Sequence, residues 1–320
     1  MQRQFLSHQL FTMFWPRIAW WPAALLLLHG NHSRADTLII DEVPLPALRI
    51  DGQPAKAHTQ GLEVAGASHY VTARREDVRP KLALLLRTPK SATNWDAWDI
   101  TPRDSGNTGM PLDHPGGMQS DGQRLWIPTA QSKPKSRSII RVFPLAAIIA
   151  GQPLKPQFEF PVNDHIGAIA VSTNHNVVLG ANWDTESVYV WDLQGNLKRT
   201  LTGSELGLRG LGAVAGADPR SGVAVQDWKI IGDRLFASGL AREPGAAATV
   251  PKSRFIVFTN FLESGFHQSA APLPLHKGTE LAREAMAISD GAVLFLPEDL
   301  GTSNRIFRVA LTNIFKSDRP

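Results

Sequence analysis

Three histidines occupy the same position of a repeated pattern along this chain. Each stands four residues before the first apolar residue of an expected strand: His58 before Leu62, His114 before Met118 and His165 before Ile169. The chain has 10 histidines, and without His8, His29 and His32 near its start, three of the remaining seven share this position. Imidazole binds transition metals and also exchanges protons near neutral pH. This recurrence makes the three histidines the first candidates for a functional site.

Two further repeats carry carboxylates near the matching position. Asp227 follows Gln226, and Glu284 precedes the next first strand by one residue. Imidazoles and carboxylates without a thiolate suit Zn, Fe, Mn or Cu better than Ca, which prefers oxygen ligands. The pattern predicts a divalent transition metal held by His58, His114, His165, Asp227 and Glu284. An open coordination position would let such a metal activate water.

Two other interpretations of the same histidines stay open. A histidine at the entrance of a repeat can hydrogen-bond the backbone of the neighbouring repeat and serve only stability. Alternatively, the side chains can bind a ligand or act as acid and base without a metal. No His-Glu-x-x-His spacing supports the metal independently. No Gly-x-Ser-x-Gly motif occurs either, and no catalytic residue is assigned.

More polar residues follow the second apolar strand of each repeat. In an antiparallel meander, the start of the first strand and the end of the second lie on the same face. The predicted ligand-binding residues on this face are Arg74, Asn182, Trp183, Asp184, Gln226, Glu298 and Asp299. Trp183 can stack on a sugar ring or pack between repeats. Pro115-Gly116-Gly117 lacks the lysine of a phosphate-binding loop and leads into a strand, so it predicts no phosphate site.

The elements that must position these residues recur five times. Each repeat has an apolar strand, a tight polar turn, a second apolar strand, a loop and a third apolar strand. The repeats are Gly61–Thr88, Gly117–Leu145, Gly167–Gly195, Asp227–Asn260 and Ala285–Asn313. Two of the turns, Asp121-Gly122 and Asp290-Gly291, are Asp-Gly pairs between apolar runs, a strong hairpin signal.

The spacing of the repeats indicates the architecture. The first-strand residues Leu62, Met118, Ile169, Trp228 and Met286 are 56, 51, 59 and 58 residues apart. A linear β-solenoid needs shorter and more uniform coils, whereas a propeller accommodates insertions in its loops. The sequence therefore predicts an all-β protein, a β-propeller with five recognisable four-stranded blades.

Four blades have an expected outer strand, at Trp95–Ile100, Gln157–Val162, Leu197–Thr202 and His267–Leu273. Few residues follow the last repeat, so we expect the N-terminal run Thr37–Ile40 to supply the fifth outer strand. Such closure of the ring removes an exposed sheet edge. A sixth, degenerate blade within Leu206–Val225 is an alternative, although this Gly- and Ala-rich segment favours a long surface loop.

Residues 1–35 have the pattern of a signal peptide. Arg17 precedes an apolar run of 11 residues, Ile18–Leu28, and Ser33-Arg34-Ala35 places small residues at the two positions read by a signal peptidase. A transmembrane helix needs about 20 apolar residues. We expect cleavage after Ala35, a single propeller domain at residues 36–320, no stable membrane span after cleavage, and a periplasmic or secreted protein. The start codon is either Met1 or Met13.

Charge and cysteine content limit the kinds of partner and site that this protein can have. The leader carries three arginines and no acid, so the mature chain has 30 basic against 29 acidic residues in place of 33 against 29. This balance, without any run of Lys and Arg, predicts no nucleic-acid partner. The chain has no cysteine, which excludes disulfides, thiolate metal sites and cysteine nucleophiles.

Several motifs carry a resemblance to known proteins. They are His114–Met118, Asp164–Ala168, Gly180–Thr185, Gln226–Trp228 and Leu296–Asp299. Together they resemble a family of uncharacterised secreted β-propeller proteins, which implies the fold and export but no activity. Val188–Asn196 also resembles the third strand and turn of a WD40 repeat, in one blade only.

These features predict a monomeric exported propeller whose funnel, lined by histidines and carboxylates, binds a ligand through a metal ion or without one. The partner is a small molecule, a glycan or a protein. One alternative is a metal-dependent hydrolase or lyase of the cell envelope. The other is a metal-free platform that binds proteins or glycans. A propeller fold alone does not choose among them.

Overall fold

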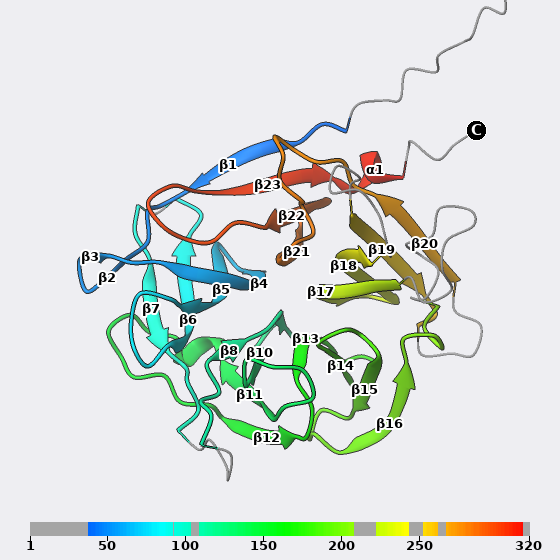
Figure 1. Cartoon of the computed structure of the whole chain (residues 1–320), viewed down its shortest axis with the longest axis horizontal. Helices are drawn as coiled ribbons and strands as arrows, with labels where there is room; N and C mark the ends of the chain where they lie inside the picture. The colour runs from blue at the N-terminus through cyan, green and yellow to red at the C-terminus, as the bar shows by residue number, and fades with distance from the viewer. Residues whose placement is uncertain are drawn as a thin grey trace, which may run out of the picture. The chain divides into compact units, whose positions relative to one another are not determined.

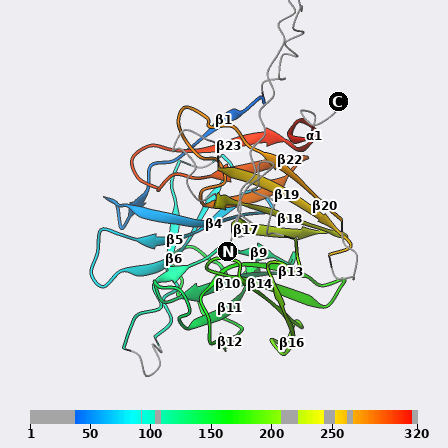
Figure 2. The ribbon, with the colours of Figure 1, turned by 45° about the vertical axis from the view of Figure 1, so that its right-hand side comes forward.

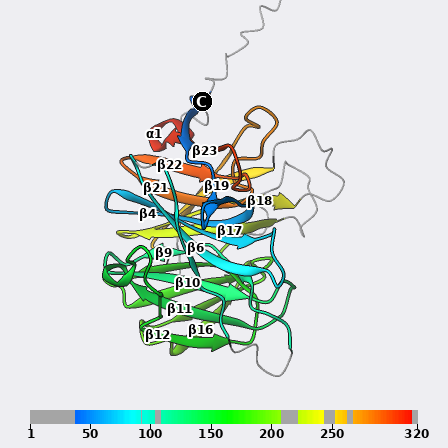
Figure 3. The same cartoon turned by 90° about the vertical axis from the view of Figure 1, so that its left-hand side faces the viewer.

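The computed structural model describes residues 38–91, 93–103, 109–207, 222–242, 252–261 and 267–315. The predicted leader lies outside these residues, and so does most of the segment considered for a sixth blade. The described residues form the predicted five-bladed β-propeller, with four-stranded antiparallel sheets arranged around a common centre (Figure 1). Figures 2 and 3 show the same sheets from two other directions.

The first two blades precede residue 163. Blade one contains β4 (Ala57–Ala65), β5 (Ser68–Arg75), β6 (Leu82–Pro89) and β7 (Asp96–Asp99). Blade two contains β10 (Arg124–Ala130), β11 (Ser138–Pro144) and β12 (Phe158–Val162). Its first strand is interrupted into β8 (His114–Pro115) and β9 (Gln119–Ser120), which both pair with β10.

The other three blades follow the same order. Blade three contains β13 (Ile166–Ser172), β14 (Val177–Asn182), β15 (Ser187–Trp191) and β16 (Leu197–Thr202). Blade four contains β17 (Gly222–Ile231), β18 (Arg234–Arg242), β19 (Ser253–Thr259) and β20 (His267–Pro272). Blade five contains β21 (Ala285–Ser289), β22 (Ala292–Leu296), β23 (Asn304–Ala310) and the N-terminal β1 (Asp41–Leu45). Outside the blades lie a small hairpin of β2 (Arg49–Ile50) and β3 (Gln53–Pro54), a 3-10 turn at Leu145–Ala147 and the short helix α1 (Leu311–Ile314).

The N-terminal strand closes the ring as predicted, but it starts later in the sequence than expected. Strand β1 pairs antiparallel with β23 and forms the outer strand of blade five (Figure 1). A segment from near the start of the chain thus completes the blade that contains the last strands. The expected strand Thr37–Ile40 is therefore wrong by several residues. Leu38 and Ile40 pack against the core of blade five instead, while Asp41 and Glu42 form ion pairs with arginines of β23. These ion pairs between the two strands favour pairing at the charged residues Asp41 and Glu42. The expected strand was chosen by hydrophobicity, which does not indicate such pairs.

Five hydrophobic clusters hold the described blades together, one at each interface between neighbours. The largest, between blades three and four, contains the fully buried Trp228. The others lie between blades five and one, four and five, one and two, and two and three. Because each sheet buries both faces against its neighbours, its strands read as nearly continuous apolar runs. This packing directs the innermost strands β4, β13, β17 and β21 toward the centre (Figure 1).

Of the two predicted Asp-Gly turns, Asp290-Gly291 has the type I′ backbone, whereas in Asp121-Gly122 only the glycine has a positive φ. Asp290 and Gly291 have φ angles of 51° and 69°, as a type I′ turn requires at both central residues. The turn between β21 and β22 thus follows from local sequence.

Candidate functional site

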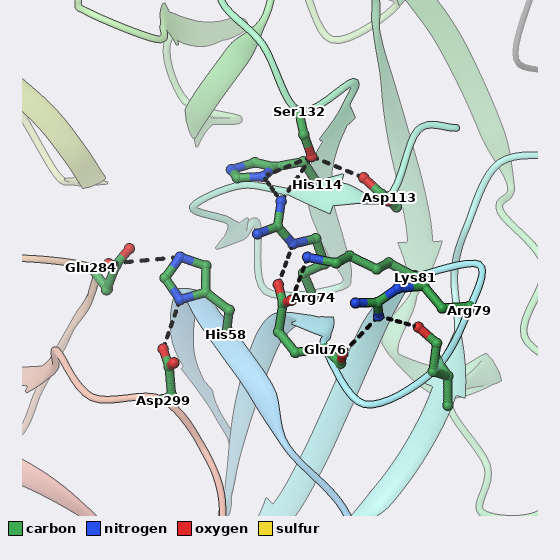
Figure 4. A network of polar contacts seen from close by, with 11 residues as sticks. His58, Arg74, Glu76, Arg79, Lys81, Asp113, His114, Ser132, Glu284 and Asp299 are labelled. Carbon is green, nitrogen blue, oxygen red and sulfur yellow. Dashed lines mark hydrogen bonds and ion pairs between the residues drawn. The ribbon is translucent and has the colours of Figure 1, made fainter. Parts of the chain in front are cut away.

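His58 lies on β4 at one end of the central strands, and two carboxylates of blade five flank its ring (Figure 4). Its Nδ1 donates to Asp299 Oδ1 at 2.7 Å, and its Nε2 lies 3.9 Å from Glu284 Oε1. The hydrogen bond to Asp299 and the charge of Glu284 raise the pKa of His58 above its usual value despite burial. The second N–H of the protonated ring therefore faces Glu284 without a normal hydrogen bond.

Glu284 is an unusual carboxyl on this face. Its side chain is 11% exposed, and burial raises its pKa to about 7. Its described contacts are ion pairs with His58 at 3.9 Å and with Arg283 at 3.5 Å, and no hydrogen bond of its carboxyl is formed by the described residues. Near neutral pH this group exists in both protonation states, so it can donate or accept a proton.

Arg74 connects this pair to blade two. It stands opposite His58 in the β4–β5 pairing. Its Nε donates to Glu76 at 2.6 Å, and its Nη1 donates to Ser132 Oγ at 2.8 Å and to His114 Nδ1 at 3.0 Å. Figure 4 shows the guanidinium between the two imidazoles, with its Nη2 on the side of His58. Within the described chain this Nη2 has no hydrogen-bond acceptor.

The contact with Arg74 fixes the protonation of His114. An arginine donates and cannot accept, so His114 Nδ1 is the acceptor and the neutral ring carries its hydrogen on Nε2. Burial, together with the nearby His165 and Arg74, lowers the pKa of His114 well below its ordinary value. His114 is thus a neutral N–H donor on this face.

His165 is buried and hydrogen-bonds the backbone of the neighbouring blade. It is almost fully buried, and its Nδ1 donates to the carbonyls of Gln131 and Lys133 in blade two at 2.7 and 3.1 Å. Burial lowers its pKa. The Trp183 ring packs against His165 at 4.5 Å and against His114 at 5.7 Å between centroids. His165 and Trp183 therefore join blades two and three beside the site, in agreement with the interpretation that such histidines hold neighbouring repeats together.

The structure does not assemble the predicted metal-ligand set. The His114 and His165 rings approach to 5.1 Å, and His58 and Glu284 lie on the same face. However, no group of three or more His, Asp or Glu side chains in the described part of the chain is arranged to hold a metal ion. The Nδ1 atoms of the three histidines contact Asp299, Arg74 and two backbone carbonyls, respectively.

Asp227 is not on this face, contrary to the prediction. Its carboxylate is fully buried among the central strands, where it accepts hydrogen bonds from the amides of Leu62, Met286 and Trp228 and from Lys229 Nζ. Asp227 stands one residue before Trp228, whereas the histidines stand four residues before Leu62 and Ile169. Asp227 therefore follows the bulge of β17 at the level of Gly61 and Ala168, three residues beyond His58 and His165. The residue of blade four at the level of the histidines is Ala224.

The remaining predicted ligand residues have varied positions. Asn182 is buried and bonds to Asp164 and to the amide of Ser187. Glu298 pairs with Arg305 of β23, and half-buried Gln226 is the bulge residue of β17. Asp184 is partly buried and close enough to His165 to affect its pKa. Of the predicted set, Arg74 and Asp299 belong to the network of Figure 4.

Five labelled residues of that network were missed at the sequence level: Glu76, Arg79, Lys81, Asp113 and Ser132. Ser132 Oγ donates to Asp113 Oδ1 at 3.0 Å and lies 3.4 Å from His114 Nδ1. Asp113 directly precedes His114, as Asp164 precedes His165. This repeated Asp-His pair is the sequence signal that could have indicated Asp113 as part of the network. An acidic residue beside each histidine can orient the hydrogen bonds around it.

Comparison with known families gives one assignment. Residues 103–288 match a model described as a family of unknown function, DUF6454, which is more than half of the chain. The chain belongs to this family. The family's matched region begins after blade one and ends in β21, so it includes His114 and His165 but not His58 or Asp299. No match to a curated protein was found.

Solved structures of other proteins are similar to this chain. A bifunctional GH43-CE protein of Bacteroides eggerthii has a TM-score of 0.51 at 10% identity, covering 76% of this chain and 32% of its own. The α-L-arabinofuranosidase Arb93A of Fusarium graminearum has a TM-score of 0.47 at 9% identity, covering 86% and 99%. This chain thus spans about a third of the first of these proteins. At such identities the likeness shows the fold alone.

In the portion of the chain that the structure describes, no helix has the length and apolar character needed to cross a membrane.

Proposed function

We propose that this protein binds a small carboxylate on the His58 face, defined as His58, Arg74, His114 and Glu284. The observation that carries the proposal is the set of N–H groups left without acceptors by the described residues: Arg74 Nη2, His114 Nε2 and, when protonated, His58 Nε2. Arg74 and His58 come from blade one, His114 from blade two and Glu284 from blade five. Donors fixed by neighbours in this way need little reorganisation to hold an anion.

Glu284 makes the proposed binding dependent on pH. Its ionised form would repel a bound carboxylate, whereas its protonated form can donate a hydrogen bond. Its pKa of about 7 reflects burial first, opposed by His58 and Arg283 and, more weakly, by Arg74, with Asp299 acting in the same direction as burial. The raised pKa of His58 keeps that ring cationic to higher pH. Affinity should therefore increase as the pH falls from 8 to 6.

The test uses a matched pair of probes, D-glucuronate and D-glucose, which differ in one carboxylate. We expect isothermal titration at pH 6 to detect glucuronate and not glucose, with weaker binding at pH 8. Arg74→Gln should weaken glucuronate binding by about 10- to 100-fold, because hydrogen bonds to charged groups contribute about 1.5–3 kcal/mol.

Arg308→Gln is the control, since Arg308 pairs with Asp41 at the outer edge of blade five. It should bind glucuronate like the wild-type protein. Equal binding of glucose, or full affinity in Arg74→Gln, would show that the His58 face does not recognise a carboxylate.

An enzyme is a second candidate, favoured by one observation. Asp299 orients His58, and Glu284, with its pKa near 7, lies 3.9 Å beyond it. This arrangement can transfer a proton without a metal, as hydrolases and lyases require. The metal-dependent form of this alternative has no ligand group to support it among the described residues. Glu284→Gln should then abolish turnover of a carboxylate substrate while preserving its binding, and preserved turnover would exclude Glu284 as the acid.

Export is proposed from the sequence alone. Arg17, the short apolar run and Ser33-Arg34-Ala35 support cleavage after Ala35 and a periplasmic or secreted location. Mass spectrometry of the protein from its native host should find Asp36 at the N-terminus. An intact leader in the membrane fraction would contradict this proposal.

A further inference from the structure

A partly open cavity lies at the end of the central strands opposite the His58 face. Its volume is about 370 Å³, within the range of small-molecule sites, and its polar lining includes Glu63 and Lys229. Glu63 lies on β4 five residues after His58. A strand rises about 3.3 Å per residue, so the two positions are roughly 16 Å apart along the strand. The cavity is therefore separate from the carboxylate site proposed above.

Lys229 brings an incompletely bonded ammonium group to this cavity. The residue is 2% exposed, and its Nζ donates to Asp227 Oδ1 at 2.5 Å. An ammonium group has three hydrogens, and a buried charge without enough partners is costly. No second acceptor for Nζ exists among the described residues. Two N–H groups thus remain for a bound molecule.

Glu63 brings a carboxyl with spare acceptor capacity. Its Oε1 accepts from the amide of Val64 at 2.9 Å, and its Oε2 accepts from the amide of Ser120 at 3.2 Å. A carboxylate offers about four acceptor positions. Glu63 and Lys229 form no ion pair within 4 Å, although the ammonium opposes the rise in the pKa of Glu63 caused by burial. Burial raises the pKa of Glu63 to about 7, so near neutral pH its carboxyl is partly ionised and lines the cavity beside the Lys229 ammonium without pairing with it.

The rest of the lining is mixed. The aliphatic residues Val64, Leu145, Ile230 and Ile288 contribute to it together with the polar Gln119 and Ser120. A ligand that complements this cavity has an acidic group near Lys229 and a basic group near Glu63. It also has an apolar side chain against the aliphatic residues. A metal cation would face Lys229, whose positive charge disfavours it.

We propose that this cavity binds a small aliphatic α-amino acid, with its carboxylate toward Lys229 and its ammonium toward Glu63. A carboxylate alone can bind Lys229 but not Glu63, and an ammonium alone can bind Glu63 but not Lys229. The α-amino acid carries both groups, which distinguishes it from simple acids and amines. The aliphatic part of the lining accommodates an apolar side chain of the size of leucine.

Isothermal titration with L-leucine, 4-methylpentanoate and 3-methylbutylamine tests each part of this assignment. The second probe lacks the ammonium and the third lacks the carboxylate. We expect leucine to bind and each analogue to bind at least tenfold more weakly. Absence of leucine binding to the wild-type protein would overturn the proposal and indicate that the cavity holds only water.

Variants locate the binding. Glu63→Gln should weaken leucine at least tenfold and leave the weak binding of 4-methylpentanoate unchanged, since that probe has no ammonium. Ile288→Phe, which fills the cavity without removing a charge, should abolish binding, and thermal melting would confirm that both variants fold. Glu159→Gln, at a half-exposed carboxyl on β12, is the matched control. Leucine binding that survives Glu63→Gln and Ile288→Phe would place the ligand elsewhere, and binding that survives Arg74→Gln would separate this site from the His58 face.

Discussion

Asp227→Ala should lower the free energy of unfolding by about 3–5 kcal/mol, the range found when one partner of a buried ion pair is removed. The carboxylate accepts from the amides of Leu62 in blade one and Met286 in blade five, and its neighbour Lys229 is almost fully buried. Without Asp227, the ammonium and these amides lose their acceptor. Chemical denaturation followed by tryptophan fluorescence measures the change.

Two further variants separate the charge from the packing. Asp227→Ala combined with Lys229→Met removes the unpaired buried ammonium, so it should be more stable than Asp227→Ala alone. Asp233→Ala removes an acid on the exposed β17–β18 turn, where the side chain is 88% exposed, and should change stability by less than about 0.5 kcal/mol. If Asp227→Ala were as mild as Asp233→Ala, the carboxylate would not hold the blades together.

Gly116→Ala should destabilise the propeller by about 3 kcal/mol, at the upper end of the range for overpacking. A Cβ at this position would lie 2.2 Å from the carbonyl oxygen and 2.7 Å from the carbonyl carbon of Gly167. These are backbone atoms of blade three, and the same carbonyl accepts from the amide of Gly117 at 2.8 Å. The clash can be relieved only by moving blades two and three apart.

Gly301→Ala is the matched control for this prediction. A Cβ at Gly301 meets no atom within 4 Å, and its backbone is not in the left-handed region. Its stability in a parallel denaturation series should stay within about 0.5 kcal/mol of the wild type. A Gly116→Ala protein as stable as Gly301→Ala would show that the inter-blade contact is adaptable.

Gly116 and its neighbour Gly117 are small residues to which the sequence alone assigned no role. Gly117 precedes Met118, and a Cβ there would lie 2.6 Å from Asp227 Oδ1. The Pro115-Gly116-Gly117 segment therefore lets first strands and the Asp227 carboxylate approach closely. Its glycines serve the packing of the ring, which agrees with the absence of the phosphate-loop lysine.

Much of the fold follows from local sequence. The outer strand of blade three, Leu197–Thr202, has the predicted bounds, and the Asp290-Gly291 turn has the backbone expected of a hairpin. Alternation of apolar strands and tight turns depends on neighbours in the sequence, which explains this agreement. The position of β1 was missed because its pairing depends on arginines about 260 residues away.

The sequence by itself determined that five similar units build a propeller and that His58, His114 and Glu284 lie at the same end of it. That much depends on strand order and periodicity. Only the tertiary structure decided which groups these side chains contact: Asp299 for His58, Arg74 for His114, and two carbonyls of blade two for His165. It also showed what Asp227 contacts in the centre, where its carboxylate accepts hydrogen bonds from the amides of Leu62 and Met286. These partners come from blades far apart in the chain, and the repeat pattern does not encode contacts between blades.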